Sequence, residues 1–431
     1  MTDELKQRIE MINRGEVPEG YKKTKVGIVP SEWEVKHFKE KFERVSRKNK
    51  EGNSNVLTIS AQQGLISQEE FFNKSVASDD KSNYYLIKKG EYAYNKSYSN
   101  GYPYGALKQL NRYEKGVISP LYICFAPTKA NKFTDYYSHY FEGGLVNREI
   151  QAFAQEGARN HGLLNIAVED FFNAFLLSPP LHEQEKTAEI LTTCDKVIAL
   201  KEKLIAEKQA QKKWLMQNLL TGKKRLHGFT GEWEKVKLGD LCDFIKNGYT
   251  YEETISENYV MITRIETISN SIINLNAVGH SEPNIDNKFL LRRGDILFSH
   301  INSLAQIGKT AYFDLDEKLY HGMNLLCIRA NSKTNSKYLF YWLNSDVSQT
   351  MYMMYAKKAV NQCSISASEL LKYQLLVPSY QEQTAIANIL STADHEIKLL
   401  QNNLAEWENK KKGLMQLLLT GKVRTLSVNC G

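Results

Sequence analysis

A single hydrophobic core rarely grows beyond about 250–300 residues, so a chain of 431 residues predicts two or more domains. With 42% hydrophobic and 24% charged residues the chain is globular rather than disordered, and its net charge of +7 gives only a modest preference for polyanions. The six cysteines contain no C-x-x-C pair, which argues against a zinc site or a disulfide framework. The polar N-terminus argues against a secretory signal, and the lack of an apolar run of about 18 residues argues against a membrane span. We therefore expect a cytoplasmic protein that has no cofactor and no membrane partner.

In chain order, the predicted elements alternate between two α+β domains and two helical spacers. We expect an N-terminal segment at 1–30, a first domain at 31–178, a spacer at 179–226, a second domain at 227–377 and a second spacer at 378–431. Runs rich in β-branched and aromatic residues predict strands in the first domain at Asn55–Ser60, Tyr84–Ile87, Glu91–Tyr94 and Val117–Phe125, followed by a helix at Thr134–Tyr140. The same pattern in the second domain predicts strands at Tyr259–Thr263, Asp295–Ser299 and Leu325–Arg329, followed by a helix at Lys337–Asn344.

The first spacer is predicted to be one long helix. Residues 183–220 contain neither Gly nor Pro and are rich in Lys, Glu, Gln, Ala and Leu. Pro179 and Pro180 precede this stretch, where their missing amide donors do least harm, and Gly222 follows it as a left-handed stop. At 1.5 Å per residue such a helix would be roughly 55–60 Å long.

The second spacer repeats the first at a fixed offset of 199 residues. The motif Leu176–Leu177–Ser178–Pro179 recurs as Leu375–Leu376–Val377–Pro378, and Leu219–Leu220–Thr221–Gly222–Lys223 recurs as Leu418–Leu419–Thr420–Gly421–Lys422. Apolar residues of the second helix are spaced by four and three, as in a coiled coil, and comprise Ile386, Leu390, Ala393, Ile397, Leu400, Leu404, Trp407, Leu414 and Leu418. Lysines interrupt the equivalent seam of the first helix at Lys201, Lys208 and Lys212. The shared register favours packing of the two helices on each other over two unrelated surface helices.

The domains that precede the helices share only scattered landmarks. Glu32–Trp33–Glu34 matches Glu232–Trp233–Glu234, and Lys88–Lys89–Gly90–Glu91 matches Arg292–Arg293–Gly294–Asp295. The residues between these landmarks mostly differ. A duplicated scaffold that carries different content suggests two similar frames with two different recognition surfaces.

These motifs resemble a known family. Leu-x-x-Pro-x-x-x-Glu-Gln followed by a long helix that ends in Leu-Leu-x-Gly-Lys-x-Arg is similar to the specificity subunit of type I restriction-modification systems, and it occurs at Leu176–Arg225 and Leu375–Arg424. The resemblance covers essentially the whole chain. It implies two α+β target recognition domains separated by a pair of long antiparallel, coiled-coil-like helices with pseudo-two-fold symmetry. It also implies three partners: double-stranded DNA, two methyltransferase subunits and the restriction translocase subunits.

An antiparallel helix pair would suit a two-part DNA target. It would place the two domains at opposite ends of the helices, and DNA half-sites one helical turn apart are separated by about 34–36 Å. A parallel pair with both domains at one end would contradict this geometry.

Enzyme motifs are incomplete in this chain. Gly308–Lys309–Thr310 lacks the first glycine of a phosphate-binding loop, because Ser303 stands there. Ser178–Pro179–Pro180 is followed by Leu181, whereas the catalytic motif of amino-methyltransferases needs an aromatic residue. We therefore expect a non-catalytic subunit. The alternatives are the specificity module of a fused restriction-methylation enzyme, which would need those missing motifs, and a structural coiled-coil adaptor, which would not need two globular domains.

Candidate DNA contacts lie in polar loops of both domains, because Arg, Lys, Asn and Gln contact bases and phosphates. The first domain offers Lys96, Ser97, Tyr98, Asn100, Tyr102, Tyr104 and Lys108, followed by Arg159 and Asn160. The second domain offers His300, Asn302 and Lys309, followed by Lys358, Asn361 and Gln362. The matching glycines Gly90 and Gly294 place the first loop of each domain on the same face. A solvated turn whose tyrosines pack on the sheet is an equally good interpretation of the first loop.

Overall fold

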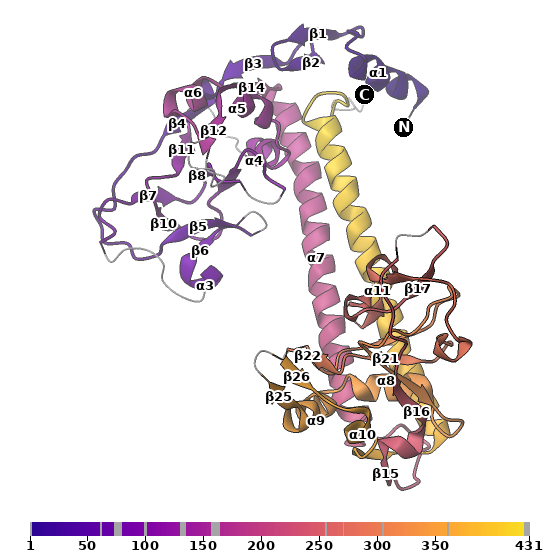
Figure 1. The fold of residues 1–431 in the computed structure, drawn as a ribbon. Helices are drawn as coiled ribbons and strands as arrows, with labels where there is room; N and C mark the ends of the chain where they lie inside the picture. Colours follow the sequence, from indigo (N-terminus) through magenta and orange to yellow (C-terminus); the bar gives the residue numbers. More distant parts are fainter. Residues whose placement is uncertain are drawn as a thin grey trace. The chain divides into compact units, whose positions relative to one another are not determined.

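The computed structural model describes residues 2–60, 63–72, 80–98, 101–129, 135–156, 164–254, 257–269, 271–303, 306–359 and 362–425 (Figure 1). The chain forms two compact units. Unit 1 comprises Met1–Lys201 and Asn403–Gly431, and unit 2 comprises Glu202–Asn402. Each unit therefore contains one globular region and a segment of both long helices.

The globular region of unit 1 is an α+β assembly. Its helices are α1 (Asp3–Asn13), α2 (Phe38–Lys41), α3 (Gln68–Phe72), α4 (Asp135–Glu142), α5 (Asn147–Phe153) and α6 (Val168–Asn173). Its first strands are β1 (Tyr21–Thr24), β2 (Gly27–Pro30), β3 (Glu34–His37), β4 (Phe42–Arg44), β5 (Leu57–Ser60), β6 (Gly64–Ser67) and β7 (Tyr85–Lys88). The remaining strands are β8 (Tyr92–Asn95), β9 (Ala106–Gln109), β10 (Lys115–Ile118), β11 (Ile123–Pro127), β12 (Gln155–Glu156), β13 (Leu164–Asn165) and β14 (Phe175–Ser178).

The globular region of unit 2 belongs to the same class. Its α-helices are α8 (Ser336–Leu343), α9 (Asp346–Tyr355) and α10 (Ala367–Leu370), and its 3₁₀ turns are Leu238–Leu241, Ile265–Thr267, Leu275–Ala277 and Asn287–Phe289. Its first strands are β15 (Glu234–Lys237), β16 (Cys242–Asn247), β17 (Val260–Ile262), β18 (Ile268–Ser269), β19 (Ile272–Ile273), β20 (Gly279–Ser281) and β21 (Ile296–Phe298). The remaining strands are β22 (Ile301–Asn302), β23 (Thr310–Tyr312), β24 (Leu326–Ala330), β25 (Lys357–Ala359), β26 (Gln362–Ser364) and β27 (Gln374–Val377).

The two units share their sheet topology. A four-stranded antiparallel sheet has the order β4-β11-β8-β9 in unit 1 and β16-β24-β21-β23 in unit 2. A two-stranded antiparallel ribbon, β3–β14 or β15–β27, joins the beginning and the end of each globular region. The last strand of each ribbon leads directly into a long helix. The duplication inferred from scattered landmarks is therefore a duplication of the whole frame.

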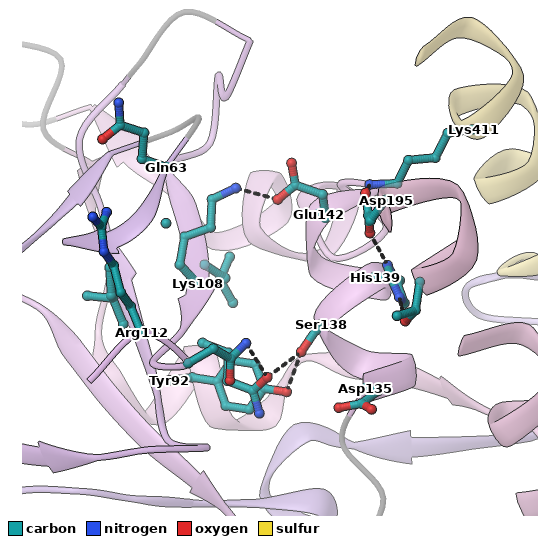
Figure 2. Close-up of a pocket in the computed structure, with 16 residues that line it drawn as sticks. Gln63, Tyr92, Lys108, Arg112, Asp135, Ser138, His139, Glu142, Asp195 and Lys411 are labelled. Carbon is teal, nitrogen blue, oxygen red and sulfur yellow. Dashed lines mark hydrogen bonds and ion pairs between the residues drawn. The ribbon is translucent and has the colours of Figure 1, made fainter. Parts of the chain in front are cut away.

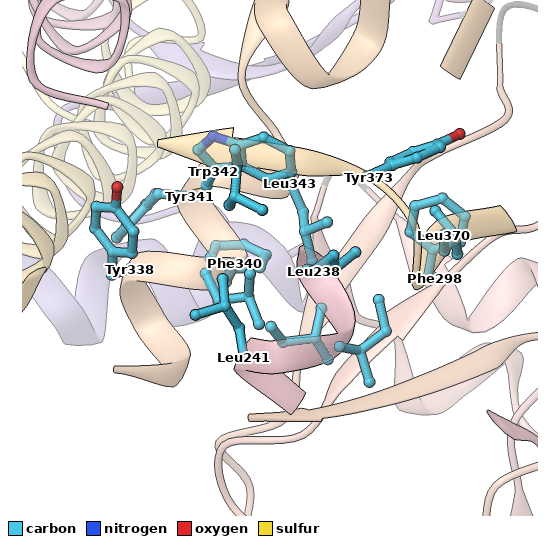
Figure 3. Packing of buried hydrophobic residues seen from close by; sticks show 14 of the residues in the cluster. Leu238, Leu241, Phe298, Tyr338, Phe340, Tyr341, Trp342, Leu343, Leu370 and Tyr373 are labelled. Carbon is cyan, nitrogen blue, oxygen red and sulfur yellow. The ribbon is translucent and has the colours of Figure 1, made fainter. Parts of the chain in front are cut away.

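The main core of each unit combines aromatic side chains of the globular region with residues of the long helices. In unit 1 the ring of Phe38 lies 4.6 Å from that of Phe171 and 5.0 Å from that of Phe125, and Leu418 of the second long helix joins the same cluster. In unit 2 the residues of α8 pack with Leu238 and Leu370 (Figure 3). The long-helix residue Leu390 belongs to the same cluster. Burial of these faces fixes each globular region on its own helix segments.

The long helices are α7 (Leu181–Leu219) and α11 (Tyr380–Leu418), each of 39 residues, which confirms the two predicted spacer helices. In each unit their segments lie side by side and run in opposite directions (Figure 1). Two of the three lysines that interrupt the predicted seam have acidic partners on the facing helix. Lys208 lies 2.7 Å from Glu396, and Lys212 lies 2.5 Å from Asp394. Charge pairs thus replace apolar contacts where the seam is weak.

One predicted strand is wrong. Val117–Phe125 is not continuous, because β10 ends at Ile118 and β11 begins at Ile123. Between them the Tyr122 amide donates to the Ser119 carbonyl at 3.1 Å, and Pro120 at this turn has no amide to donate to a ladder. The two strands belong to different sheets, since β10 pairs with β7 and β11 lies in the four-stranded sheet. Among the described residues, no helix has both the length and the apolar character that crossing a membrane requires.

Candidate nucleic-acid interface

The same turn leads into the candidate loop of each unit. Gly90 and Gly294 adopt φ values of +86° and +95°, which favour glycine. The acidic residue that follows accepts a backbone hydrogen bond from three residues earlier, Glu91 from the Lys88 amide and Asp295 from the Arg292 amide, both at 2.8 Å. An arginine that contacts both carboxylate oxygens completes each turn.

Those arginines are Arg47, at 2.8 and 2.9 Å from Glu91, and Arg329, at 2.7 Å from both oxygens of Asp295. Comparison of the two repeats in the sequence identified the acidic residues of these turns. It did not identify the arginines, because they are distant from the turns in the chain. The turn fixes the strand, β8 or β21, that delivers the loop.

In unit 1 the loop begins at the end of β8. The Asn95 carboxamide oxygen accepts from the Ser97 amide at 3.1 Å, which holds Lys96, Ser97 and Tyr98 in a local turn. Tyr98 is 62% exposed, so its ring is available to a partner. Asn100 lies outside the described residues.

Two further tyrosines of this loop form hydrogen bonds within the same domain. The Tyr104 carbonyl accepts from the Tyr94 hydroxyl at 2.6 Å, and the half-buried Tyr104 side chain packs against the core. The Tyr102 hydroxyl donates to Glu142 at 2.5 Å. Burial, helped by the Glu142 carboxylate, raises the pKa of Tyr102, so this hydroxyl remains protonated at neutral pH.

Lys108 is largely enclosed by the domain. Its side chain is 11% exposed, and its ammonium group forms an ion pair with Glu142 (Figure 2). It also donates to the Tyr102 hydroxyl at 3.0 Å. A DNA phosphate would have to compete with Glu142 for this charge. The DNA contact of Lys108 stays a prediction.

The second candidate segment of unit 1 meets the first through the backbone. β12 pairs with β13, and the Leu164 amide at the start of β13 donates to the Lys96 carbonyl at 3.0 Å. Arg159 and Asn160, in the connection between these strands, lie outside the described residues.

Unit 2 brings its two candidate segments together in the same way. β22 pairs with β26, placing Ile301 opposite Ser364 and Asn302 opposite Cys363, and β25 completes a three-stranded sheet. The backbones of Lys358 and Gln362 lie in β25 and β26, while their side chains, and all of Asn361, lie outside the described part of the chain. In each unit, backbone hydrogen bonds therefore bring together two segments from distant parts of the sequence.

The described candidates of unit 2 differ in accessibility. His300 is 7% exposed, and its Nε2 accepts from the Asn247 carboxamide at 3.2 Å. Burial lowers the pKa of His300, so the neutral ring is favoured. The Asn302 side chain is held locally by the Ser303 amide at 2.8 Å and the Ser299 hydroxyl at 3.2 Å. Lys309 is exposed and forms no ion pair with the described residues.

A polar pocket lies where the globular region of unit 1 meets its helix segments. It has a volume of about 550 Å³ and is lined by residues of β9, α4, α7 and α11 (Figure 2). Inside it, Asp195 of α7 lies 2.5 Å from Lys411 of α11 and 3.7 Å from Nδ1 of the buried His139. The Nε2 atom of His139 lies 3.1 Å from the Thr192 hydroxyl.

Unit 2 has the equivalent pocket, of about 1130 Å³. There Asp394 of α11 pairs with Lys212 of α7 at 2.5 Å and accepts from the Tyr341 hydroxyl at 2.7 Å. The Tyr341 hydroxyl oxygen accepts from the Ser391 hydroxyl at 3.2 Å. The four roles match position by position, with Tyr341 in the place of His139. Within the described residues no group of three or more His, Cys, Asp or Glu side chains is placed to hold a metal ion.

Comparison with known proteins relates this architecture to one family. Residues 230–409 match the type I restriction modification DNA specificity domain. The chain is 39% identical over 194 residues to a putative type I restriction enzyme MjaX specificity subunit of Methanocaldococcus jannaschii, covering 44% of this chain and 46% of that protein. It is 26% identical over 302 residues to the type I restriction enzyme MjaVIII specificity subunit of the same organism, covering 65% of this chain and 69% of that protein.

A solved structure supports the same fold. This structure describes the structural basis of complex assembly and conformational transition of the type I R-M system, and it aligns with a TM-score of 0.57 at 16% identity. The alignment covers 92% of this chain and 99% of that chain.

Proposed function

We propose that the chain is a type I restriction-modification specificity subunit and supplies the DNA sequence specificity of such a system, because residues 230–409 match the specificity domain and two similar proteins are named as specificity subunits. Its two globular regions, over residues 31–178 and 227–377, each recognise one half of a bipartite, asymmetric double-stranded DNA target. The long helices hold two adenine-N6 methyltransferase subunits, and restriction subunits join that core. The chain itself carries no catalytic site.

One observation carries this proposal: a conserved frame delivers different loops. The four-stranded sheet and the Gly–acid–Arg turn recur in both units, whereas Lys96–Ser97–Tyr98 in one unit corresponds to His300–Ile301–Asn302 in the other. An enzyme that acts at one centre has no need for two such surfaces. A protein that recognises two unrelated short sequences needs one frame and two sets of side chains.

The accessibility and local structure of the candidate residues suggest different roles in DNA binding. Tyr98 and Lys309 are accessible, and we assign Lys309 to a phosphate because an exposed ammonium without a carboxylate partner can replace DNA counterions. Asn302 ends strand β22 and Ser97 lies in the turn after β8, so the backbone of both is held in place, as base contacts require. His300 and Tyr104 then support the loops from inside.

The proposal is tested with the purified chain, with and without its methyltransferase partner. Alone, the chain should transfer no methyl group from S-adenosylmethionine to duplex DNA. With the partner it should direct adenine methylation and bind DNA in a sequence-dependent way. Methylation by the chain alone would support the fused enzyme, and failure of the complex to bind DNA would support the structural adaptor.

A further inference from the structure

A buried carboxylate begins each long helix. Glu183 and Glu382 stand in the first turns of α7 and α11, and their side chains are 1% and 2% exposed. Next to each, a glutamine closes the helix start, since the Gln184 and Gln383 carboxamides donate to the Pro179 and Pro378 carbonyls at 2.7 and 3.1 Å. A carboxylate buried in this way needs a charged partner.

The partner comes from the end of the opposite helix in both cases. Arg225, just after α7, donates Nε and Nη2 to the two oxygens of Glu382, both at 2.7 Å. Arg424, just after α11, donates to Glu183 through Nη2 and, at 3.4 Å, through Nε. The pairs join residues 157 and 241 positions apart in the sequence. Planar two-point contacts of this kind fix orientation as well as distance.

A tryptophan connects each pair to the globular region. Trp33 Nε1 donates to Glu183 at 3.4 Å, and the Arg225 guanidinium lies 5.6 Å from the centre of the Trp233 ring. Trp33 immediately precedes β3, and Trp233 immediately precedes β15, the strands that begin the two ribbons. Each arginine therefore holds the first strand of a globular region against the start of the helix that follows that region.

We infer that Arg424 and Arg225 are positioning residues for DNA recognition, each serving the half-site of its own unit. The assignment crosses the order of the sequence, because Arg424 lies beyond the second domain yet serves the first. It rests on the proposed function. The mechanism is orientation: without the two-point contact the frame stays folded, but its loops are no longer presented at one angle.

The test uses the full chain in complex with its methyltransferase partner and a randomised duplex DNA library. The uncharged pairs Arg424→Met with Glu183→Gln, and Arg225→Met with Glu382→Gln, avoid leaving a buried unpaired charge, and each variant is the matched control for the other. The first pair should reduce discrimination about tenfold in the half-motif of unit 1 only, comparable to the loss of one base contact. The second should do the same for unit 2 only.

Hydrogen exchange provides a second readout that does not need DNA. Arg424→Lys, which cannot make the planar two-point contact, should accelerate exchange in β3 and β14 but not in β15 and β27. Arg225→Lys should do the reverse.

The outcomes separate the two levels of the argument. A wild-type complex that selects no sequence would overturn the proposed function. A wild-type complex that selects a two-part motif, with variants that keep both halves or lose both equally, would overturn the positioning role alone. Hydrogen exchange that accelerates in the ribbon of the other unit, or in neither ribbon, would also overturn the positioning role.

Discussion

The two junctions between helix and globular region share an aspartate and a lysine but differ in the side chain that faces the aspartate. In unit 1, Asp195 lies between Lys411 and His139, and in unit 2 its counterpart Asp394 lies between Lys212 and Tyr341. The aspartate and the lysine exchange helices between the units, because α7 gives the acid in one and the base in the other. The loops at the candidate DNA surface, by contrast, share almost no residues. The frame is thus conserved where the helices meet the globular regions and varies where DNA is proposed to bind.

The largest expected effect comes from replacing one variable surface. Exchanging residues 31–178 for the equivalent region of a relative should change one half of the recognised motif and leave the other half intact, because each unit has its own loops. The change in preference should reach roughly 10³-fold, the lower range of the difference between specific and non-specific binding. Selection from a randomised DNA library measures it. A change in both halves would mean that the units are not separate reading modules.

Removing equivalent core residues should show that the conserved frames have similar stability. Leu191 and Leu390 are both 0% exposed at matching positions of α7 and α11. Replacing either by Ala should cost about 2–5 kcal/mol in its own unit, from lost burial and the cavity left behind. Denaturant unfolding followed by hydrogen exchange in each unit measures this. Leu200→Ala and Leu399→Ala are the matched controls, since these side chains are 67% and 54% exposed and should change little.

The junction histidine should make unit 1 sensitive to acid. Burial lowers the pKa of His139 below 6.5, more than the Asp195 charge raises it, and Lys411 lowers it further. Thr192, Asp135 and Glu142 complete its surroundings. Below pH 6.5 the unfolded chain therefore takes up a proton that the folded unit refuses, and stability falls until the folded pKa is reached.

Copying the junction of unit 2 into unit 1 isolates this effect. His139→Tyr should remove the acid-dependent loss, which amounts to at most about 1.4 kcal/mol per pH unit for one proton. Stability measured at several pH values in both chains gives the difference, and the reciprocal Tyr341→His is the control. Equal pH dependence in wild type and His139→Tyr would show that His139 does not titrate in this way.

The smallest effect concerns the charges at the candidate surface. Lys309→Ala should weaken binding of the complex to all sequences alike and lower the slope of log affinity against log salt by about one. Lys108→Ala, whose lysine pairs with Glu142, should lower the slope less. DNA binding measured over a range of salt concentrations compares them. A change in sequence preference at an unchanged slope would place Lys309 at a base instead.

The sequence predicted those parts of the molecule that depend on local pattern. The first long helix was expected within two residues of its observed start and end, because prolines and a glycine limit it. The repeat predicted the second helix, and the acidic turns at Gly90 and Gly294 were visible as landmarks. Partners distant in the chain could not be predicted. Nothing near Glu183 indicates Arg424, and nothing near Lys212 indicates Asp394, because antiparallel packing brings them together only after folding. The Val117–Phe125 strand failed because Pro120 interrupts a run whose composition is otherwise typical of a strand.

The candidate DNA surface shows the same division. The sequence indicated which loops are polar, and the structure joins them in pairs through the Lys96 carbonyl in unit 1 and the β22–β26 pairing in unit 2. The sequence did not indicate which of these side chains are buried. Composition makes His300 and Lys309 equally good candidates, yet one is enclosed and the other is exposed.

Mapping of methylated adenines in the genome of the organism that encodes this chain tests the central claim most directly. If two similar frames with different loops each recognise one half-site, the methylated motif must be bipartite and asymmetric, with a fixed number of unspecified base pairs between its halves. Deleting the coding sequence of this chain should abolish that motif and no other. A contiguous or palindromic motif, or a bipartite motif that survives the deletion, would contradict the account.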